Sequence, residues 1–387
     1  MNDLIIYRDF IANSYSDELK LIISLVSGID YKIEWNNINW DKFIKLSLKH
    51  RLYPFYKYSD ISIPESVINE LRLKHQQNTM RILPMVSELI RINKVFQEYD
   101  IEVIWMKGPV LSQKLYNNVN TRIYNDLDVL IDIENFQKVQ EIMLCLGYEL
   151  TNLPSELNFF QKKILFHFRN QIDFFNKNNN TTVEIHWRLT NPKGLYDISF
   201  QNLLSSAENE IIAGEKIPTL GKENYLLYLM THCALHQWVL LSWLKDIDSF
   251  IMKYPINFEI LFNEARKWRL EKIVYQSLVL SNIIFNTRLP EKHEIIKDSL
   301  YKKFINTSLK NITSDKIFQS GSDISKFRHV FDLMKLSKSL SYKLNALFKI
   351  FINTDDWKNI RLPLLLFPIY FIIRPFTWFA KTYLNKK

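Results

Sequence analysis

Glycine and cysteine are both scarce in this sequence of 387 residues. Seven glycines argue against an architecture that rests on repeated glycine-rich phosphate loops, and neither a P-loop nor a GxGxxG motif occurs. The two cysteines, Cys145 and Cys233, are separated by a long stretch of chain, which excludes a disulfide framework and a cysteine-based structural zinc site. A reducing compartment is therefore favoured, and we expect the protein to be cytoplasmic.

Long hydrophobic runs are also missing. Residues 1–20 combine acidic residues with a short apolar patch and lack the basic start and long apolar stretch of a signal peptide, so we expect none. The most apolar stretch, residues 362–373, is too short for a membrane span and is interrupted by Pro363 and Pro368. We expect the tail at 352–387, which contains this stretch, to dock on the protein or to make peripheral contact with a membrane surface.

The remaining composition is that of an ordinary globular protein. Hydrophobic residues make up 47% of the chain and charged residues 24%, which excludes the disordered, collagen-like and fibrous classes. The length exceeds a comfortable single core, so we expect two or three packed units. Lys and Arg outnumber Asp and Glu by 50 to 41, and the net charge of +9 suggests an anionic partner such as a nucleotide, a nucleic acid or a membrane surface.

Hydrophobic periodicity divides the chain into helical and strand-like parts. Apolar residues recur every three or four positions from residue 16 to about residue 100, and helical spacing returns at residue 223 and dominates to about residue 351. Between these regions lie short apolar or alternating runs that predict strands. The runs are residues 101–106, 126–131, 171–175 and 182–187. The pattern predicts a central region of strands and helices that is bracketed by helices.

Turn and cap signals join these runs. The polar tract at 176–180 predicts a hairpin between the last two strands, and a second hairpin is expected around Gly214. Asp132 is suited to cap the N-terminus of a helix that ends at Gly147 in a left-handed conformation. A tight turn at 107–109 links the first strand to a helix.

Three acidic side chains lie within apolar strands. Asp126 and Asp128 alternate with apolar residues, so both point to the same face of a strand, about 6–7 Å apart. Two neighbouring carboxylates favour a bound cation, and hard oxygen ligands suit Mg²⁺ together with substrate phosphates. Glu184 is the best third ligand, because an unpaired carboxylate inside an apolar strand is costly. The alternative is that these acids line the solvent face of a half-exposed sheet, which is the commoner explanation for an Asp-x-Asp pair alone.

The setting of these acids carries a family resemblance. Its motifs are Lys107-Gly108, Leu111, Tyr116, Arg122, Asn125–Ile131, Gly147-Tyr148 and Val183–Trp187. With these motifs the chain resembles the family of uncharacterised bacterial nucleotidyltransferases within the DNA polymerase beta superfamily. The likeness extends from about Trp40 to Asp248.

The resemblance implies an α+β fold, in which a small mixed β-sheet forms the nucleotidyltransferase core between N-terminal and C-terminal helical regions. We expect an N-terminal helical region at residues 1–98, the catalytic core at 99–220 and a C-terminal helical domain at 221–351. The apolar and basic tail at 352–387 follows them.

The resemblance also implies a site and a reaction. In the superfamily a glycine turn after the first strand holds the nucleotide phosphates, and three carboxylates on two strands bind metal. The matching positions here are Gly108, Asp126, Asp128 and Glu184. Two Mg²⁺ ions, or Mn²⁺ in their place, would assist an acceptor that attacks the α-phosphate of a nucleoside triphosphate, with release of pyrophosphate. The superfamily normally has Gly-Ser at the turn, whereas this chain has Gly108-Pro109.

Five further residues are candidates for contact with the nucleotide. Lys107 and Arg122 are placed to bind phosphate oxygens, with ordinary surface cations as the alternative. His186 shares the strand face of the third acid, where it contacts nucleotide or acceptor or, as the favoured alternative, hydrogen-bonds the carboxylates. Lys245 and Asp246 resemble a family pair that closes over the nucleotide, although adjacent exposed charges on a helix are common.

A zinc site is the less favoured interpretation of one further group. His232 and His236 lie one helical turn apart on either side of Cys233. Cys233 replaces the glutamate of an HExxH motif, and no third ligand is evident. We therefore expect these residues to serve in helix packing or in the lining of a binding pocket.

The leading hypothesis is a Mg²⁺-dependent nucleotidyltransferase that transfers a nucleoside monophosphate to an unidentified acceptor, namely a small molecule, a glycan precursor or a protein. Transfer to tRNA, as in toxin-like relatives within the superfamily, ranks second. RNA is disfavoured because the lysines are dispersed from Lys20 to Lys387 and form no basic stripe with interleaved aromatic residues. The other alternative is a catalytically inactive nucleotide-binding scaffold, against which the complete set of three acids argues.

Overall fold

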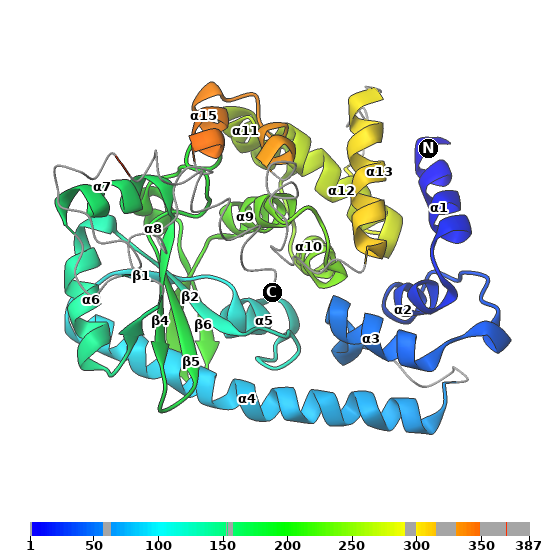
Figure 1. The fold of residues 1–387 in the computed structure, drawn as a ribbon, viewed down its shortest axis with the longest axis horizontal. Coiled ribbons are helices and arrows are strands. Elements are labelled where there is room, and N and C mark those ends of the chain that lie inside the picture. Colours follow the sequence, from blue (N-terminus) through cyan, green and yellow to red (C-terminus); the bar gives the residue numbers. More distant parts are fainter. Residues whose placement is uncertain are drawn as a thin grey trace.

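The computed structural model describes residues 2–56, 63–151, 153, 158–290, 299–314, 330–348 and 369. Apart from residue 369, the tail expected at 352–387 lies outside the described residues. Figure 1 shows a sheet flanked by helices, with one long helix that runs past both the sheet and the N-terminal helices. No helix in the described ranges combines the length and the apolar character needed to span a lipid bilayer.

The strands of the described chain form one seven-stranded sheet. They are β1 Val103–Trp105, β2 Asp126–Ile131, β3 Glu149–Leu150, β4 Gln171–Asn176, β5 Thr181–His186, β6 Glu208–Ile212 and β7 Glu215–Thr219. Their order is β3-β4-β5-β2-β1-β7-β6, with parallel pairs at β2·β5 and β1·β7 and antiparallel pairs elsewhere. The sheet is therefore mixed, and the predicted strands and both predicted hairpins are confirmed.

Helices surround this sheet and build the two flanking regions. They are α1 Asn2–Ser14, α2 Asp17–Ser27, α3 Trp40–His50, α4 Glu65–Glu98, α5 Gly108–Tyr116, α6 Phe136–Cys145, α7 Phe159–Phe168, α8 Phe200–Ser205, α9 Lys222–Leu235, α10 Leu241–Lys253, α11 Phe258–Trp268, α12 Glu271–Phe285, α13 Ser299–Thr313 and α15 Leu340–Phe348. Short 3₁₀ helices lie at η1 Trp35–Asn37, η2 Tyr53–Phe55 and η3 Ile133–Asn135. The fold is α+β, as predicted.

Local signals set the ends of the helix that follows β2. Asp132 caps η3 by accepting a hydrogen bond from the backbone N–H of Glu134, and α6 follows directly. After α6 the chain turns at Gly147, which adopts a φ of 84° in the left-handed region. Both features agree with the start and the stop predicted for this segment.

The alternation in β2 gives the sheet two different faces. Leu127, Val129 and Ile131 are buried in an apolar cluster with residues of α4 and α6. Because successive side chains of a strand point to opposite faces, Asp126 and Asp128 lie on the other side. The sheet thus has one apolar face, which α4 and α6 cover, and one face that carries the acids.

The N-terminal and C-terminal helices share one apolar core. It contains Phe43 of α3, Leu226 of α9 and Leu280 of α12. His50, the last residue of α3, accepts a hydrogen bond through Nδ1 from the backbone N–H of Leu241 at 3.3 Å. Two helical regions that are distant in sequence therefore pack against each other, while the expected domain boundaries stay a prediction.

We expect His50 to make the stability of this contact depend on pH. Burial lowers the pKa of His50 from 6.5 to about 3, so the folded protein keeps the imidazole neutral while the unfolded chain protonates it below pH 6.5. The contribution of His50 to the free energy of unfolding is therefore fully present above pH 6.5. It is lost as the pH falls toward 3, by up to about 1.4 kcal/mol per pH unit.

The variant His50→Asn tests this expectation, because its side-chain oxygen can accept the same hydrogen bond but does not titrate. Urea unfolding between about pH 4 and 7 should show a shallower loss of stability in the variant than in the wild type. An equally steep loss in both proteins would contradict the prediction.

Candidate active site

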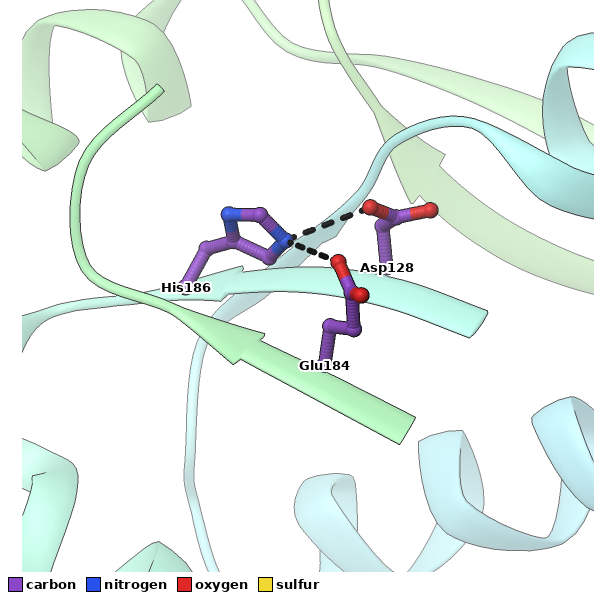
Figure 2. A group of neighbouring side chains, drawn as sticks. All are labelled: Asp128, Glu184 and His186. Atoms are coloured by element: carbon purple, nitrogen blue, oxygen red, sulfur yellow. Dashed lines mark hydrogen bonds and ion pairs between the residues drawn. The ribbon is translucent and has the colours of Figure 1, made fainter. Parts of the chain in front are cut away.

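Parallel pairing of β2 with β5 brings two acids and a histidine together. The register aligns Asp128 with Glu184 and Leu130 with His186, and alternation keeps the side chains of these two acids and the histidine on one face. Figure 2 shows the imidazole of His186 bridging the two carboxylates, with Nε2 at 3.2 Å from Asp128 Oδ1 and at 3.3 Å from Glu184 Oε2. His186 therefore hydrogen-bonds the acids, as expected from the sequence.

The same side chains form a group that fits a divalent metal ion. One ligand atom from each of Asp128, Glu184 and His186 lies within 4.8 Å of the others. The second oxygen of Asp128, Oδ2, is buried and has no hydrogen-bond partner among the described residues. A buried carboxylate oxygen without a partner is costly, and a cation bound there would remove that cost. Carboxylate oxygens suit Mg²⁺ or Mn²⁺, so the donor set fits the expected metal.

Lys107 places a positive charge beside the acids. It follows β1 closely, and its Nζ lies 2.5 Å from Asp128 Oδ1. Burial alone would raise the pKa of Asp128, but the charge of Lys107 and the hydrogen bond from His186 outweigh burial and hold this pKa below its usual range. Burial would also lower the pKa of Lys107, yet the charge of Asp128 raises it well above its ordinary value. Lys107 and Asp128 are therefore both ionised at neutral pH.

Asp126 differs from Asp128 in its electrostatic state. It shares the acidic face at the first position of β2, but it does not belong to the group of three potential ligands. Burial and repulsion by Asp128 raise the pKa of Asp126 to about 7, and the attraction of Lys107 offsets them only in part. Asp126 is therefore only partly ionised at neutral pH.

Gly108 brings the start of α5 against the first acid of β2. It adopts a φ of 55°, a left-handed conformation that favours glycine. A Cβ atom built at this position would lie 3.2 Å from the backbone oxygen of Asp126, which is a tight contact. The start of α5 therefore lies against the backbone of Asp126, and a helix N-terminus favours phosphate oxygens. Contact between Gly108 and phosphate stays a prediction.

Arg122 is bound by a buried carboxylate of α10. Its Nε lies 3.0 Å from Asp246 Oδ1, and one terminal nitrogen lies 2.9 Å from Asp246 Oδ2. Tyr116, at the end of α5, donates to Asp246 Oδ1 at 2.9 Å, and Arg122 Nη1 donates to the backbone oxygen of Gly108 at 3.4 Å. Two residues that the sequence assigned to nucleotide binding thus contact each other and tie the glycine turn to α10.

Lys245 has its partners within the C-terminal helices. Its Nζ lies 2.7 Å from Asp248 Oδ2 and 5.5 Å from the ring centroid of Phe285. Thr287 donates a hydrogen bond to the other oxygen of Asp248 at 2.7 Å. The structure therefore places Lys245 against α12, and its closure over a nucleotide stays a prediction.

Rings from α9 and α10 lie near the acidic face. His232, His236 and Trp243 pack together, with ring centroids 4.6, 5.4 and 5.1 Å apart. Burial lowers the pKa of His232 well below its ordinary value, and the charge of Lys107 lowers it further. Burial raises the pKa of Tyr228, which also lies within electrostatic reach of Lys107. α9 therefore approaches the acids, and His232 and His236 take part in helix packing, as expected.

Three residues near this site are not among the residues that the sequence assigned to it. Asp173 of β4 lies opposite Glu184 in the antiparallel register, so it shares the acidic face. Arg51, which follows α3, and Arg81 of α4 donate hydrogen bonds to the segment that precedes β2. The alternation of residues 171–175 contained a signal for Asp173, whereas no local pattern connects the arginines with the acids.

Comparison with known protein families matches residues 36–286 to a family described as uncharacterised nucleotidyltransferases. This match covers the whole sheet, the acidic face and the helices from α3 to α12. No curated protein matches the sequence.

The solved structures that match this chain include an antibiotic-resistance factor and an antibiotic adenylyltransferase. The solution structure of the antibiotic-resistance factor ANT(2'')-Ia has 14% identity and a TM-score of 0.34, and the similarity covers 49% of this chain and 92% of that one. The lincosamide antibiotic adenylyltransferase LnuA, bound to lincomycin, has 20% identity and a TM-score of 0.30, with 42% of this chain and 94% of that one covered. An antigenic nucleotidyltransferase-like protein from Paracoccidioides brasiliensis has 14% identity and a TM-score of 0.29, with coverage of 51% and 94%.

We expect Asp126→Asn to stabilise the metal-free protein. The pKa of Asp126 is raised from 3.8 to about 7 in the folded state. The contribution of this group to the free energy of unfolding is therefore fully present below pH 3.8 and is lost as the pH rises through 7. The neutral amide avoids the repulsion by Asp128, so the advantage of the variant should grow between about pH 4 and 7 and then level off.

Thermal unfolding in the presence of EDTA measures this effect. Asp128→Asn provides the contrast, since it removes the charged partner of Lys107 and should be less stable than the wild type under the same conditions. If Asp126→Asn melts below the wild type at about pH 8, the assigned charge state of Asp126 is wrong.

Proposed function

The chain belongs to the family of uncharacterised nucleotidyltransferases, and from this premise we propose the reaction that its acidic face supports. The protein transfers a nucleoside monophosphate from a nucleoside triphosphate to an acceptor, depends on Mg²⁺ and releases pyrophosphate. The observation that supports this proposal most is the buried Oδ2 atom of Asp128, which has no hydrogen-bond partner among the described residues and belongs to a carboxylate grouped with Glu184 and His186. Such an atom is suited to bind a cation.

Asp126, Asp128 and Glu184 are the proposed metal ligands. Asp128 offers Oδ2, because Lys107 and His186 already hold its Oδ1 atom. Asp126 loses its proton when a cation binds nearby, since an opposite charge lowers the pKa of a carboxyl group. Two Mg²⁺ ions, or Mn²⁺ in their place, would neutralise charge on the triphosphate and activate the attacking oxygen when bound.

Lys107 and the start of α5 are the proposed contacts for the triphosphate. The ammonium group of Lys107 has three N–H donors. The side chain is 18% exposed to solvent while it is paired with Asp128. It can therefore donate to a phosphate oxygen without leaving the carboxylate. The start of α5 at Gly108 adds the positive end of the helix dipole at the same place.

The chemistry is an in-line displacement at the α-phosphorus. The acceptor oxygen forms a bond to this phosphorus, the bond to the bridging oxygen of the β-phosphate breaks, and its electron pair leaves with pyrophosphate. Glu184 accepts the proton of the acceptor hydroxyl, and its side chain is 19% exposed, which leaves it accessible. His186 positions Glu184 and Asp128 relative to each other through its Nε2 atom.

Arg122 and Asp246 have an indirect role in this proposal. Their ion pair fixes the backbone oxygen of Gly108 and the end of α5 against α10. The glycine turn is thereby held in place before substrate binds, which reduces the entropy lost on binding. Lys245 lies over the ring of Phe285, and Asp248 accepts a hydrogen bond from Thr287, so these two residues hold α10 against the end of α12.

The acceptor in this proposal is a small molecule, a glycan precursor or a protein hydroxyl. RNA ranks second, because lysines are spread along the chain from Lys20 to Lys387 and do not form a continuous basic stripe in the sequence.

We predict that Asp126→Asn and Asp128→Asn each lower transfer by about a hundredfold or more, because each removes an anionic ligand of the metal. The measurement is pyrophosphate release and label transfer with Mg²⁺ and each labelled nucleoside triphosphate, in the presence of extracted metabolites, protein and RNA. The Asp126 variant is the more informative of the two, because its stability is expected to be preserved.

Glu149→Gln provides a matched control, because Glu149 is an exposed carboxylate on edge strand β3 of the same sheet. This control should retain wild-type transfer. Wild-type turnover in either aspartate variant would contradict the assigned ligands. A wild-type protein that binds triphosphate but releases no pyrophosphate with any acceptor would be an inactive scaffold.

A further inference from the structure

Two arginines from the N-terminal helices lie against the segment that leads into β2. Arg51, the first residue after α3, donates from Nη1 to the backbone oxygen of Ile123 at 3.2 Å. Arg81 of α4 donates from Nη2 to the backbone oxygen of Tyr124 and, at 2.8 Å, to Asn78 Oδ1. Both guanidinium groups therefore reach the short segment between α5 and the acids.

Neither arginine pairs with a carboxylate among the described residues, and this distinguishes them from the other cations of the site. Lys107 is paired with Asp128, and Arg122 is paired with Asp246. The hydrogen bonds of the two arginines go to neutral groups instead. The surroundings of the acids therefore contain positive charge that has no direct partner in the described chain.

These cations also repel one another. Burial lowers the pKa of Arg51, and the charges of Arg122 and Arg81 lower it further, against the attraction of Asp126. Two further guanidinium groups and one acid thus lie within electrostatic reach of Arg51. A bound anion would compensate this crowding of positive charge in a partly buried setting.

The glycine turn indicates which part of a substrate the arginines meet. A Cβ atom built on Gly108 would lie 3.2 Å from the backbone oxygen of Asp126 and 3.8 Å from the ring of Tyr124. The start of α5 therefore borders on the residue that Arg81 holds through its backbone oxygen. A helix N-terminus and two guanidinium groups on one segment suit an extended chain of phosphates.

We propose that Arg51 and Arg81 bind the β- and γ-phosphates of the nucleoside triphosphate, and hence the pyrophosphate that leaves. This inference rests on the proposed function, and it adds that the N-terminal helices supply part of the substrate site. A guanidinium binds phosphate oxygens through parallel hydrogen bonds, and Arg51 has donors beyond the one given to Ile123. Because charge accumulates on the leaving group, these contacts strengthen during transfer.

The chain offers a close control for Arg51. Arg51 follows α3 with a φ of 56°, and Arg269 follows α11 with a φ of 59°, so both arginines occupy the same left-handed position at a helix end. Arg269 is exposed, and within the described ranges no hydrogen bond or ion pair connects its side chain with the acidic face. The substitutions Arg51→Gln and Arg269→Gln therefore change the same backbone setting, but only the first is near the site.

The test is calorimetric titration of the full chain with inorganic pyrophosphate and Mg²⁺, which requires no knowledge of the preferred base. Arg51→Gln should raise the Kd for pyrophosphate about tenfold or more, whereas Arg269→Gln should match the wild type. Nucleoside monophosphates should bind the wild type and Arg51→Gln equally. Arg51→Lys, which keeps the charge but not the bidentate geometry, should be intermediate and serves as the reporting variant if Arg51→Gln does not fold.

Unchanged pyrophosphate binding in Arg51→Gln would overturn the inference. If Arg51→Gln does not fold, unchanged binding in Arg51→Lys would do so. A second titration uses a single-stranded RNA oligonucleotide in place of pyrophosphate. If Arg51→Gln weakens the binding of RNA but not of pyrophosphate, the arginines bind a nucleic-acid backbone instead. Failure of the proposed function gives a different result: the wild type would bind pyrophosphate through Arg51 but would transfer no nucleotide.

Discussion

The site depends above all on the contacts of the Asp128 carboxylate. One of its oxygens is held by Lys107 and His186, and the other is buried without a partner among the described residues. The charge of Lys107 and the hydrogen bond from His186 keep the group ionised despite its burial, and they leave its second oxygen without a hydrogen-bond partner among the described residues. An ionised carboxylate with one unpartnered oxygen has the chemistry of a ligand for a divalent metal ion.

The fold supplies this carboxylate with neighbours from distant parts of the chain. The parallel register of β2 and β5 brings in Glu184, the glycine turn brings the start of α5, and α9 approaches from the C-terminal region. Cations from the N-terminal helices complete the surroundings. Because α3 and α10 share a core and a hydrogen bond at His50, the two helical regions hold both sides of the site in fixed positions.

The sequence predicted those parts of the site that local patterns encode. Alternation in residues 126–131 fixes the face on which Asp126 and Asp128 lie, and the strand around Glu184 has the same period. The pairing of Arg122 with Asp246 could not be predicted, because the two residues are 124 positions apart and their contact depends on how α10 packs. The contact of Arg51 with the segment before β2 could not be predicted either, since a single charged residue after a helix has many ordinary explanations.

Binding of a divalent ion to the acidic face tests this account most directly. Calorimetry or electron paramagnetic resonance with Mn²⁺ compares the wild type, Asp128→Asn and the exposed strand control Glu149→Gln at a pH where the folded state of each is verified. Asp128→Asn should raise the Kd for Mn²⁺ at least about tenfold, while Glu149→Gln should leave it unchanged. Equal affinity in the wild type and in Asp128→Asn would contradict the central claim that this carboxylate holds the metal.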